Sequence, residues 1–131
     1  MNFFINTNSD LPILKLPTTD LSEQYDITND MWENCAVTFS MYNSLDGTFY
    51  IANEPGKIIV EEKLFNEADP YDYFVIFQFR KNHVRKHGVY VGEFKIDFIN
   101  NPNGCGTLTI PVNETLHVFI KDSITKTEVI S

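Results

Sequence analysis

The stretch Tyr90-Val91-Gly92-Glu93-Phe94-Lys95-Ile96-Asp97-Phe98 decides the fold class of this chain. Its apolar and charged side chains alternate, with Phe94, Ile96 and Phe98 on one face and Glu93, Lys95 and Asp97 on the other. A period of two residues is that of a β-strand with one buried face, whereas a helix repeats every 3.6 residues. We therefore expect a strand here whose aromatic face lies in the core.

Strand-like segments recur on both sides of this stretch. They cover residues 37–42, 48–52, 57–64, 108–112 and 116–120, and turn-forming clusters at 43–47, 53–56 and 100–104 separate several of them. Tyr73–Phe79 is apolar on both faces, so we expect a central strand that is covered on both sides. About seven or eight short strands and no convincing helix predict an all-β antiparallel sandwich or barrel.

The first third of the chain is less regular. Leu11–Pro17 is bracketed by prolines and is an edge strand at best, and residues 19–34 are polar and could hold a short helical turn. We divide the chain into an N-terminal arm and edge segment (residues 1–34) and a β-sandwich domain (residues 35–131).

Composition narrows the function classes. The chain has 131 residues, which fits one domain, and a net charge of −8, which argues against nucleic acid as a partner. No apolar run is long enough to span a bilayer, and the first residues lack the basic character of a signal peptide, so we expect no membrane partner and a reducing cytoplasm as the place of synthesis. Cys35 and Cys105 are therefore expected to be free thiols rather than an inter-sheet disulfide.

The candidate catalytic and metal-binding motifs are weak. His83 and His87 have helical metal-ligand spacing, but Arg80, Lys81, Arg85 and Lys86 surround them and would repel a cation. The carboxylates follow no calcium-loop spacing, and a paired-carboxylate hydrolase is the least favoured alternative. We expect no catalytic residue, no metal and no cofactor, and the protein is not predicted to be an enzyme.

Two segments are candidate partner-binding sites. Phe3, Phe4 and Ile5 have no obvious place in the sandwich and either add a strand to the edge of a neighbouring subunit or fold back on their own domain. Arg80, Lys81, Arg85 and Lys86 form a local basic patch that either contacts an acidic neighbour or is a solvated loop.

A third set of side chains, the aromatic residues expected in outward-facing or loop positions, could stack on sugars or pack at contacts. They are Tyr42, Tyr50, Tyr71 and Phe119.

The order of features from Cys35 to Lys121 resembles the N-terminal domain of phage baseplate upper proteins. The stretches that carry the resemblance are Ala36-Val37-Thr38-Phe39-Ser40-Met41, Leu45-Asp46-Gly47-Thr48-Phe49, Tyr73-Phe74-Val75-Ile76-Phe77-Gln78-Phe79, Gly88-Val89-Tyr90-Val91-Gly92-Glu93-Phe94-Lys95-Ile96, Gly106-Thr107-Leu108-Thr109-Ile110-Pro111 and Leu116-His117-Val118-Phe119-Ile120. The order fits about two-thirds of the chain. It departs from the family in its N-terminal extension and in ending soon after the last strand, whereas family members continue into larger tail-organising regions.

The resemblance implies an immunoglobulin-like β-sandwich without catalysis or cofactor. It implies a bacteriophage virion structural protein, located in the virion after assembly in the host cytoplasm. Such a protein would be an adaptor or accessory subunit in a tail, baseplate or fibre or on the capsid, with other virion proteins as partners and an oligomeric state in the particle. The alternative is a carbohydrate-binding β-sandwich module.

Overall fold

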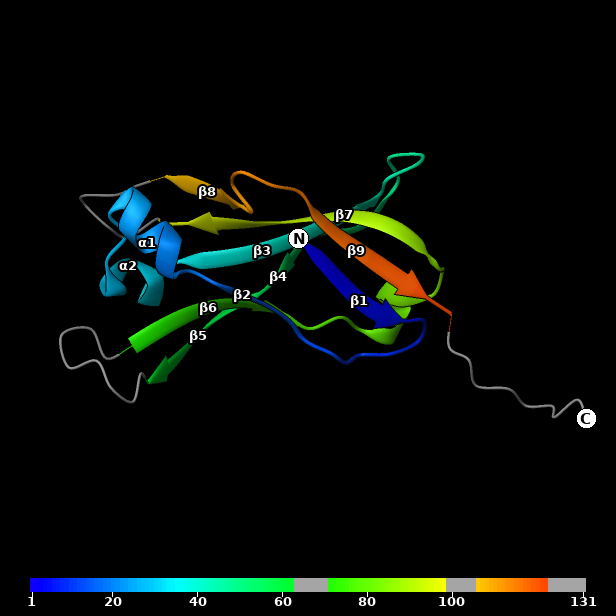
Figure 1. Cartoon of the computed structure of the whole chain (residues 1–131), viewed down its shortest axis with the longest axis horizontal. Helices are drawn as coiled ribbons and strands as arrows, with labels where there is room; N and C mark the ends of the chain where they lie inside the picture. Colours follow the sequence, from blue (N-terminus) through cyan, green and yellow to red (C-terminus); the bar gives the residue numbers. More distant parts are fainter. Residues whose placement is uncertain (63–70, 99–105, 123–131) are drawn as a thin grey trace, which may run out of the picture.

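The computed structural model describes residues 1–62, 71–98 and 106–122, and within them the chain forms two facing β-sheets (Figure 1). Sheet A has the order β1-β9-β7-β3-β4, with β8 also paired to β7, and sheet B has the order β2-β6-β5. The strands of sheet A are β1 (Asn2–Asn6), β3 (Ala36–Asn43), β4 (Phe49–Pro55), β7 (Gly88–Asp97), β8 (Thr107–Ile110) and β9 (Leu116–Lys121). Those of sheet B are β2 (Leu14–Pro17), β5 (Lys57–Glu62) and β6 (Tyr71–Phe77).

The core lies between the inner faces of the two sheets, as the alternation in residues 90–98 predicts. Phe94 and Ile96 are fully buried on β7, and Phe39 on β3 stacks on Phe77 of β6 with ring centroids 4.6 Å apart. The all-β sandwich is confirmed, because two sheets pack face to face and do not close into a barrel. The narrower immunoglobulin-like assignment stays a prediction.

Gly56 is the point at which the chain passes from one sheet to the other. The sequence predicts a turn at residues 53–56, but β4 runs to Pro55 and β5 begins at Lys57, and β4 pairs with β3 in sheet A whereas β5 pairs with β6 in sheet B. A Cβ at Gly56 would lie 2.9 Å from the Ile76 carbonyl oxygen and 2.9 Å from Val37 Cγ1. The predicted turn is therefore wrong: the glycine instead allows the crossing strand to pass close to both sheets.

The first 34 residues are more regular than predicted, and they belong to the sandwich. β1 joins sheet A in parallel with β9, and β2 joins sheet B. Two short helices follow, α1 (Thr19–Tyr25) and α2 (Asn29–Glu33). The Thr28 hydroxyl accepts a hydrogen bond from the Met31 amide and caps α2.

Trp32 anchors these helices to one end of the sandwich. Its side chain is 1% exposed, it packs edge-on against Phe98 at 5.4 Å, and its Nε1 donates to Ser22 Oγ at 2.7 Å. Because the indole N–H has a partner inside the protein, the ring can be buried without an unsatisfied donor.

The remaining strand predictions have mixed outcomes. The hairpin at 43–47 is confirmed, with Asn43 Oδ1 accepting from the Leu45 amide and Gly47 at φ +73°. The strand predicted at 73–79 is central in sheet B, but full cover on both faces is wrong, since Phe74 and Ile76 are half-buried on its outer face. Lys15 lies over the Phe74 ring at 4.2 Å, which shields part of that face. The turn predicted at 100–104 lies outside the described residues.

Candidate interaction surface

The outer face of sheet A carries an exposed band of apolar side chains. We call it the outer apolar band and define it as Phe4 on β1, Phe119 on β9, Val89 and Val91 on β7, Tyr42 on β3 and Phe49 on β4. The strand registers place these residues in adjoining rows, since Phe4 pairs with Phe119, Phe119 with Val89, Val91 with Tyr42 and Tyr42 with Phe49. The band thus crosses all five strands of the main path of the sheet.

The four rings of the band pack in two pairs, and in each pair one ring is exposed and the other is half-buried. Phe4 stacks on Phe119 with centroids 4.9 Å apart, and Tyr42 lies 5.6 Å from Phe49. Phe4 is 54% exposed and Phe49 is 62% exposed. Single exposed apolar residues are common on proteins, whereas a contiguous exposed patch marks a contact site.

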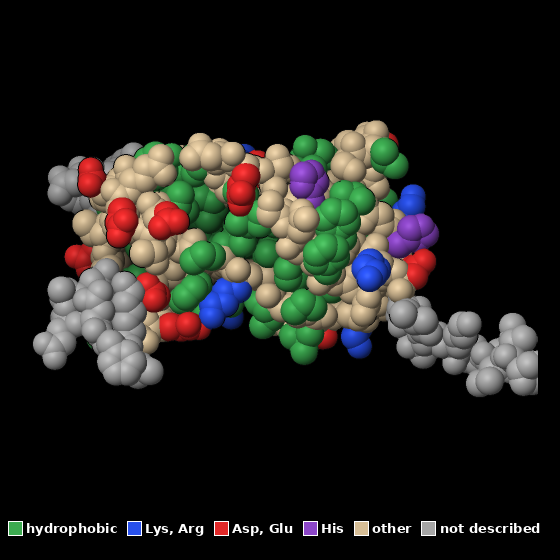
Figure 2. Space-filling view, in the orientation of Figure 1, with side chains coloured by type: hydrophobic (Ala, Val, Ile, Leu, Met, Phe, Trp, Pro, Cys, Tyr) green, Lys and Arg blue, Asp and Glu red, His purple; other side chains and the backbone are tan. Residues whose placement is uncertain are grey.

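The rest of the same face is polar. Towards the end that holds α1 and α2, its outward side chains are Thr38 and Ser40 on β3 and Glu93, Lys95 and Asp97 on β7. Figure 2 shows hydrophobic side chains gathered around β1 and β9 and most carboxylates at the end that holds the two helices. The apolar half of sheet A therefore has a definite boundary.

The three N-terminal candidates have different surroundings. Ile5 is buried, and Phe3 is half-buried and stacks on Phe79 at 5.7 Å, so both side chains pack on their own domain. Phe4 points to the opposite face of the sheet and is exposed. The segment therefore folds back on its own domain, as the second of our two expectations had it, and Phe4 is the member of the three that a partner can reach.

The basic candidates lie in and around a short 3₁₀ helix, η1 (Lys81–Val84). Lys81, Arg85 and Lys86 are exposed, but Arg80 Nη2 bonds to both carboxylate oxygens of Glu54 at 2.8 and 2.9 Å. Next to these four residues, His87 Nδ1 lies 3.1 Å from Asp122 Oδ2. The patch is thus partly neutralised by acidic groups of the same chain, which weakens its attraction for an acidic partner.

His83 has a structural role in this segment. The ring is buried, its Nδ1 accepts from the Arg80 amide at 3.0 Å, and its Nε2 lies 3.1 Å from Glu54 Oε2. The bond at Nδ1 places the proton of the neutral ring on Nε2, from which it can be donated to Glu54. Among the described residues, no group of three His, Cys, Asp or Glu side chains could hold a metal ion.

The two candidate segments are neighbours in space. The Asn8 amide, just beyond β1, donates to the Val84 carbonyl at the end of η1 at 2.9 Å. The chain just after β1 therefore lies beside the end of η1, a proximity that the sequence alone does not reveal.

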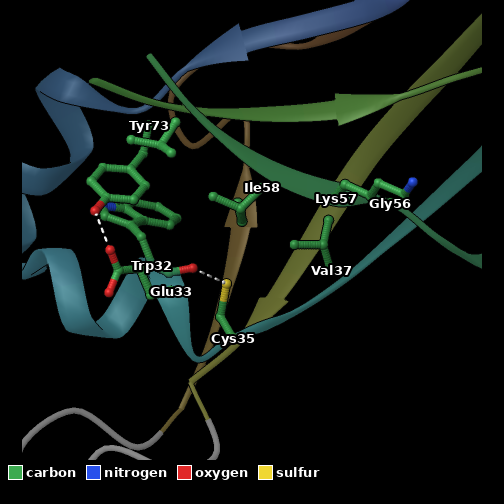
Figure 3. A pocket seen from close by; sticks show the side chains of 9 residues that line it. Trp32, Glu33, Cys35, Val37, Gly56, Lys57, Ile58 and Tyr73 are labelled. Carbon is green, nitrogen blue, oxygen red and sulfur yellow. Dashed lines mark hydrogen bonds between the residues drawn. The ribbon is translucent and has the colours of Figure 1, made fainter. Parts of the chain in front are cut away.

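A cavity of about 370 Å³ opens between the two sheets near α2 (Figure 3). Its walls are Trp32, Glu33, Cys35, Val37, Gly56, Lys57, Ile58, Val60 and Tyr73. Two of its polar side chains bond within the chain: the Tyr73 hydroxyl donates to Glu33 Oε1 at 2.7 Å, and Cys35 Sγ donates to the Trp32 carbonyl at 3.2 Å.

Two groups of this cavity, the Cys35 thiol and the Tyr73 hydroxyl, have raised pKa values. Burial raises the pKa of the Cys35 thiol to about 11. Burial, and next the hydrogen bond to Glu33, raise the pKa of Tyr73 to about 12. A thiol with such a pKa is almost entirely protonated at neutral pH, which is the opposite of what nucleophilic catalysis requires.

Cys35 is a free thiol, as predicted, while Cys105 lies outside the described residues. Two of the four predicted outward-facing aromatic residues, Tyr42 and Phe119, belong to the outer apolar band. The other two lie elsewhere, since Tyr71 is at the start of β6 near the helices and Tyr50 packs edge-on against Tyr90.

The sequence contained a signal for the outer apolar band that our strand assignments did not use. In Val89-Tyr90-Val91 and in His117-Val118-Phe119, apolar or aromatic residues occupy both faces of the strand. A strand of this kind in a sheet with one open face must expose some of them.

Comparisons with known proteins found no relative of this chain. The described residues form an all-β sandwich with an exposed apolar band on one sheet face. No family model matches the chain, and no curated protein or solved structure matches it either. Within the described segments, no helix is long and apolar enough to cross a membrane.

Proposed function

We propose that this chain is a structural component of a bacteriophage virion, a non-catalytic adaptor or accessory subunit that holds other virion proteins through the outer apolar band. The observation that supports the proposal most is the band itself. It crosses five strands on the outer face of sheet A, where its side chains add little to the core. Its burial by another protein would remove a large apolar area from water.

Two further features fit this function. The sequence resembles a module of phage baseplates, which contributes to assemblies through protein contacts. The aromatic rings of the band are already packed in pairs, so a partner would meet a surface whose side chains need little ordering. Adaptor proteins bind through such preorganised surfaces with a small entropic cost.

The direct test is to purify phage particles on a density gradient from bacteria that carry the gene and to analyse their proteins by mass spectrometry. We expect the chain in the particle fractions at a constant ratio to the capsid protein. Recovery of the chain solely outside the particles would overturn the virion assignment.

A pair of variants tests the surface. Phe49→Ser together with Val89→Ser removes two exposed side chains of the band, and Lys95→Ser changes the polar half of the same face. In cells that supply the variant in place of the natural chain, we expect incorporation to fall for the double variant and to persist for Lys95→Ser. Equal incorporation of both would exclude the band as the contact surface.

A further inference from the structure

The outer edge of β1 lies at the end of sheet A and has backbone groups that are directed away from the sheet. On its inner side, the Met1 carbonyl accepts from the His117 amide at 2.9 Å and the Thr7 amide donates to the Lys121 carbonyl at 2.7 Å. Alternate residues of a strand direct their N–H and C=O groups to opposite sides. The N–H and C=O groups of Asn2, Phe4 and Asn6 therefore point outward, where no strand of the described residues pairs with them. Of these groups, the Asn6 carbonyl accepts from the Ser9 amide at 3.3 Å.

This edge lacks the protection that the other sheet edges have. Charged residues or prolines mark those strands, namely Glu54 and Pro55 in β4, Lys15 and Pro17 in β2, and Lys57, Glu61 and Glu62 in β5. β8 has four residues and is followed by Pro111. β1 contains neither a charge nor a proline, although charged or proline residues are the usual means of blocking strand addition.

The sequence of β1 is complementary to itself when it is read in the opposite direction. It runs Asn2-Phe3-Phe4-Ile5-Asn6, so an antiparallel copy centred on Phe4 places Asn opposite Asn, Phe3 opposite Ile5, and Phe4 opposite Phe4. In this register the outward-pointing peptide groups of residues 2, 4 and 6 face those of the second copy, as a hydrogen-bonded antiparallel ladder requires. The Asn6 carbonyl, which already accepts from the Ser9 amide, would accept from Asn2 of the second copy with its second lone pair. The two Phe4 rings would meet directly beside the Phe4–Phe119 stacks.

The charges of the chain favour this antiparallel arrangement. The acidic residues of α1, α2 and the connecting loop, Asp20, Glu23, Asp26, Asp30 and Glu33, lie at one end of the molecule, and β1 runs from its middle towards the other end (Figure 1). An antiparallel pair of β1 strands puts the two acidic ends at opposite ends of the dimer. A side-by-side parallel arrangement would bring them together and would also leave the interface unsymmetrical.

We propose that β1 is a dimerisation edge, at which a second copy of this chain adds its own β1 by a two-fold axis at Phe4 to form one continuous sheet. This inference deepens the proposed function because it names a second copy as one partner, and it rests on β1 rather than on the whole outer apolar band. Two-fold contacts of this kind are the commonest in homo-oligomers.

Analytical ultracentrifugation of the full chain, together with two variants, tests the proposal. We expect a concentration-dependent species of 30.2 kDa, which is twice the 15.1 kDa of one chain. The Phe4 side chain points out of the core, so Phe4→Lys should not disturb the fold. It places two like charges at the two-fold axis and should raise the dissociation constant of the dimer by about 100-fold. Phe49→Lys is the matched control, because it puts the same charge on the same face, on β4, and should leave the dimer intact.

Amide hydrogen exchange supplies a readout that locates the contact. We expect the Phe4 amide to be protected at high protein concentration and to lose this protection on dilution or in Phe4→Lys. A natural chain that stays monomeric in the ultracentrifuge at the highest protein concentration used for hydrogen exchange would overturn the proposal. So would a dimer whose Phe4 amide exchanges freely, because another surface would then hold it.

These results are separate from the test of the virion assignment. A monomer that still enters particles refutes the β1 dimer and leaves the proposed function standing. A β1 dimer that never enters particles refutes the proposed function and leaves the dimer standing.

Discussion

Replacing Gly56 by alanine should destabilise the fold more than replacing any exposed turn glycine. An added Cβ would lie 2.9 Å from the Ile76 carbonyl oxygen and 2.9 Å from Val37 Cγ1, distances below those of ordinary carbon contacts. The valine methyl can rotate, but the carbonyl belongs to the backbone of the central strand of sheet B and cannot move without shifting that strand. Overpacking costs about 1–3 kcal/mol, and the fixed backbone contact puts this site near 3 kcal/mol.

Urea unfolding followed by circular dichroism measures this cost, and the corresponding fall in melting temperature is about 10 °C for a chain of this size. Gly47→Ala is the matched control. No atom lies within 4 Å of its added Cβ, so its cost comes from the positive φ of +73° alone and should be about 1 kcal/mol. If Gly56→Ala were as stable as Gly47→Ala, our account of the sheet crossing would be refuted.

Three further predictions concern the region between the sheets and α2. In a Cys105→Ser background, iodoacetamide should modify Cys35 about 100-fold more slowly in the folded chain than in the urea-unfolded chain at pH 8, because its pKa rises from 9.0 to about 11; similar rates would contradict the burial of the thiol. Because the pKa values of Cys35 and Tyr73 are raised in the folded chain, the unfolded chain loses these protons first, and the free energy of unfolding should fall as the pH rises above 9. Tyr73→Phe should flatten the part of this decline above pH 10, and a free energy of unfolding that stays level from pH 8 to pH 11 would contradict the burial of both groups. Trp32→Phe loses the hydrogen bond to Ser22 and part of the buried ring, so it should lower the free energy of unfolding by about 1–2 kcal/mol in urea titrations. Ser22→Ala in the Trp32→Phe background removes only the remaining bond from the Ser22 hydroxyl to the Thr18 carbonyl and should cost less than Ser22→Ala in the natural chain; equal costs in the two backgrounds would show that the Trp32–Ser22 bond contributes nothing.

The strands with one polar face were predictable from the sequence, and the connections between the sheets were not. The alternation at Phe94 and Ile96 fixes which side chains enter the core, because a strand offers two faces and charge marks the outer one. A glycine after proline is equally compatible with a hairpin and with the crossing at Gly56. The choice between them depends on contacts with Ile76, which lies twenty residues further along the chain.

The position of the N-terminal segment also could not be predicted from the sequence. Phe3, Phe4 and Ile5 were identified as apolar residues that need cover, and this expectation was physically sound. The strand that holds this segment in sheet A, with Phe3 and Ile5 towards the core, is β9, more than a hundred residues away, and parallel pairing between distant strands leaves no local mark in the sequence. Of the candidate surface, Phe4 and Phe119 were singled out in advance, whereas their stacking followed only from the register.

The structure separates the residues that hold the fold from those that we assign to partners. Sheet B has fewer strands than sheet A, so it covers only part of the inner face of sheet A. Trp32 of α2 and Val84 of η1 are buried in the same core and cover further parts of that face. The inner faces are thus covered within the chain, and the core does not need the outer apolar band. Substitutions such as Phe49→Ser should therefore leave the free energy of unfolding within about 0.5 kcal/mol of the natural chain, as is usual for exposed sites. An apolar residue that stabilises little and stays exposed needs another explanation, and contact with a partner supplies one.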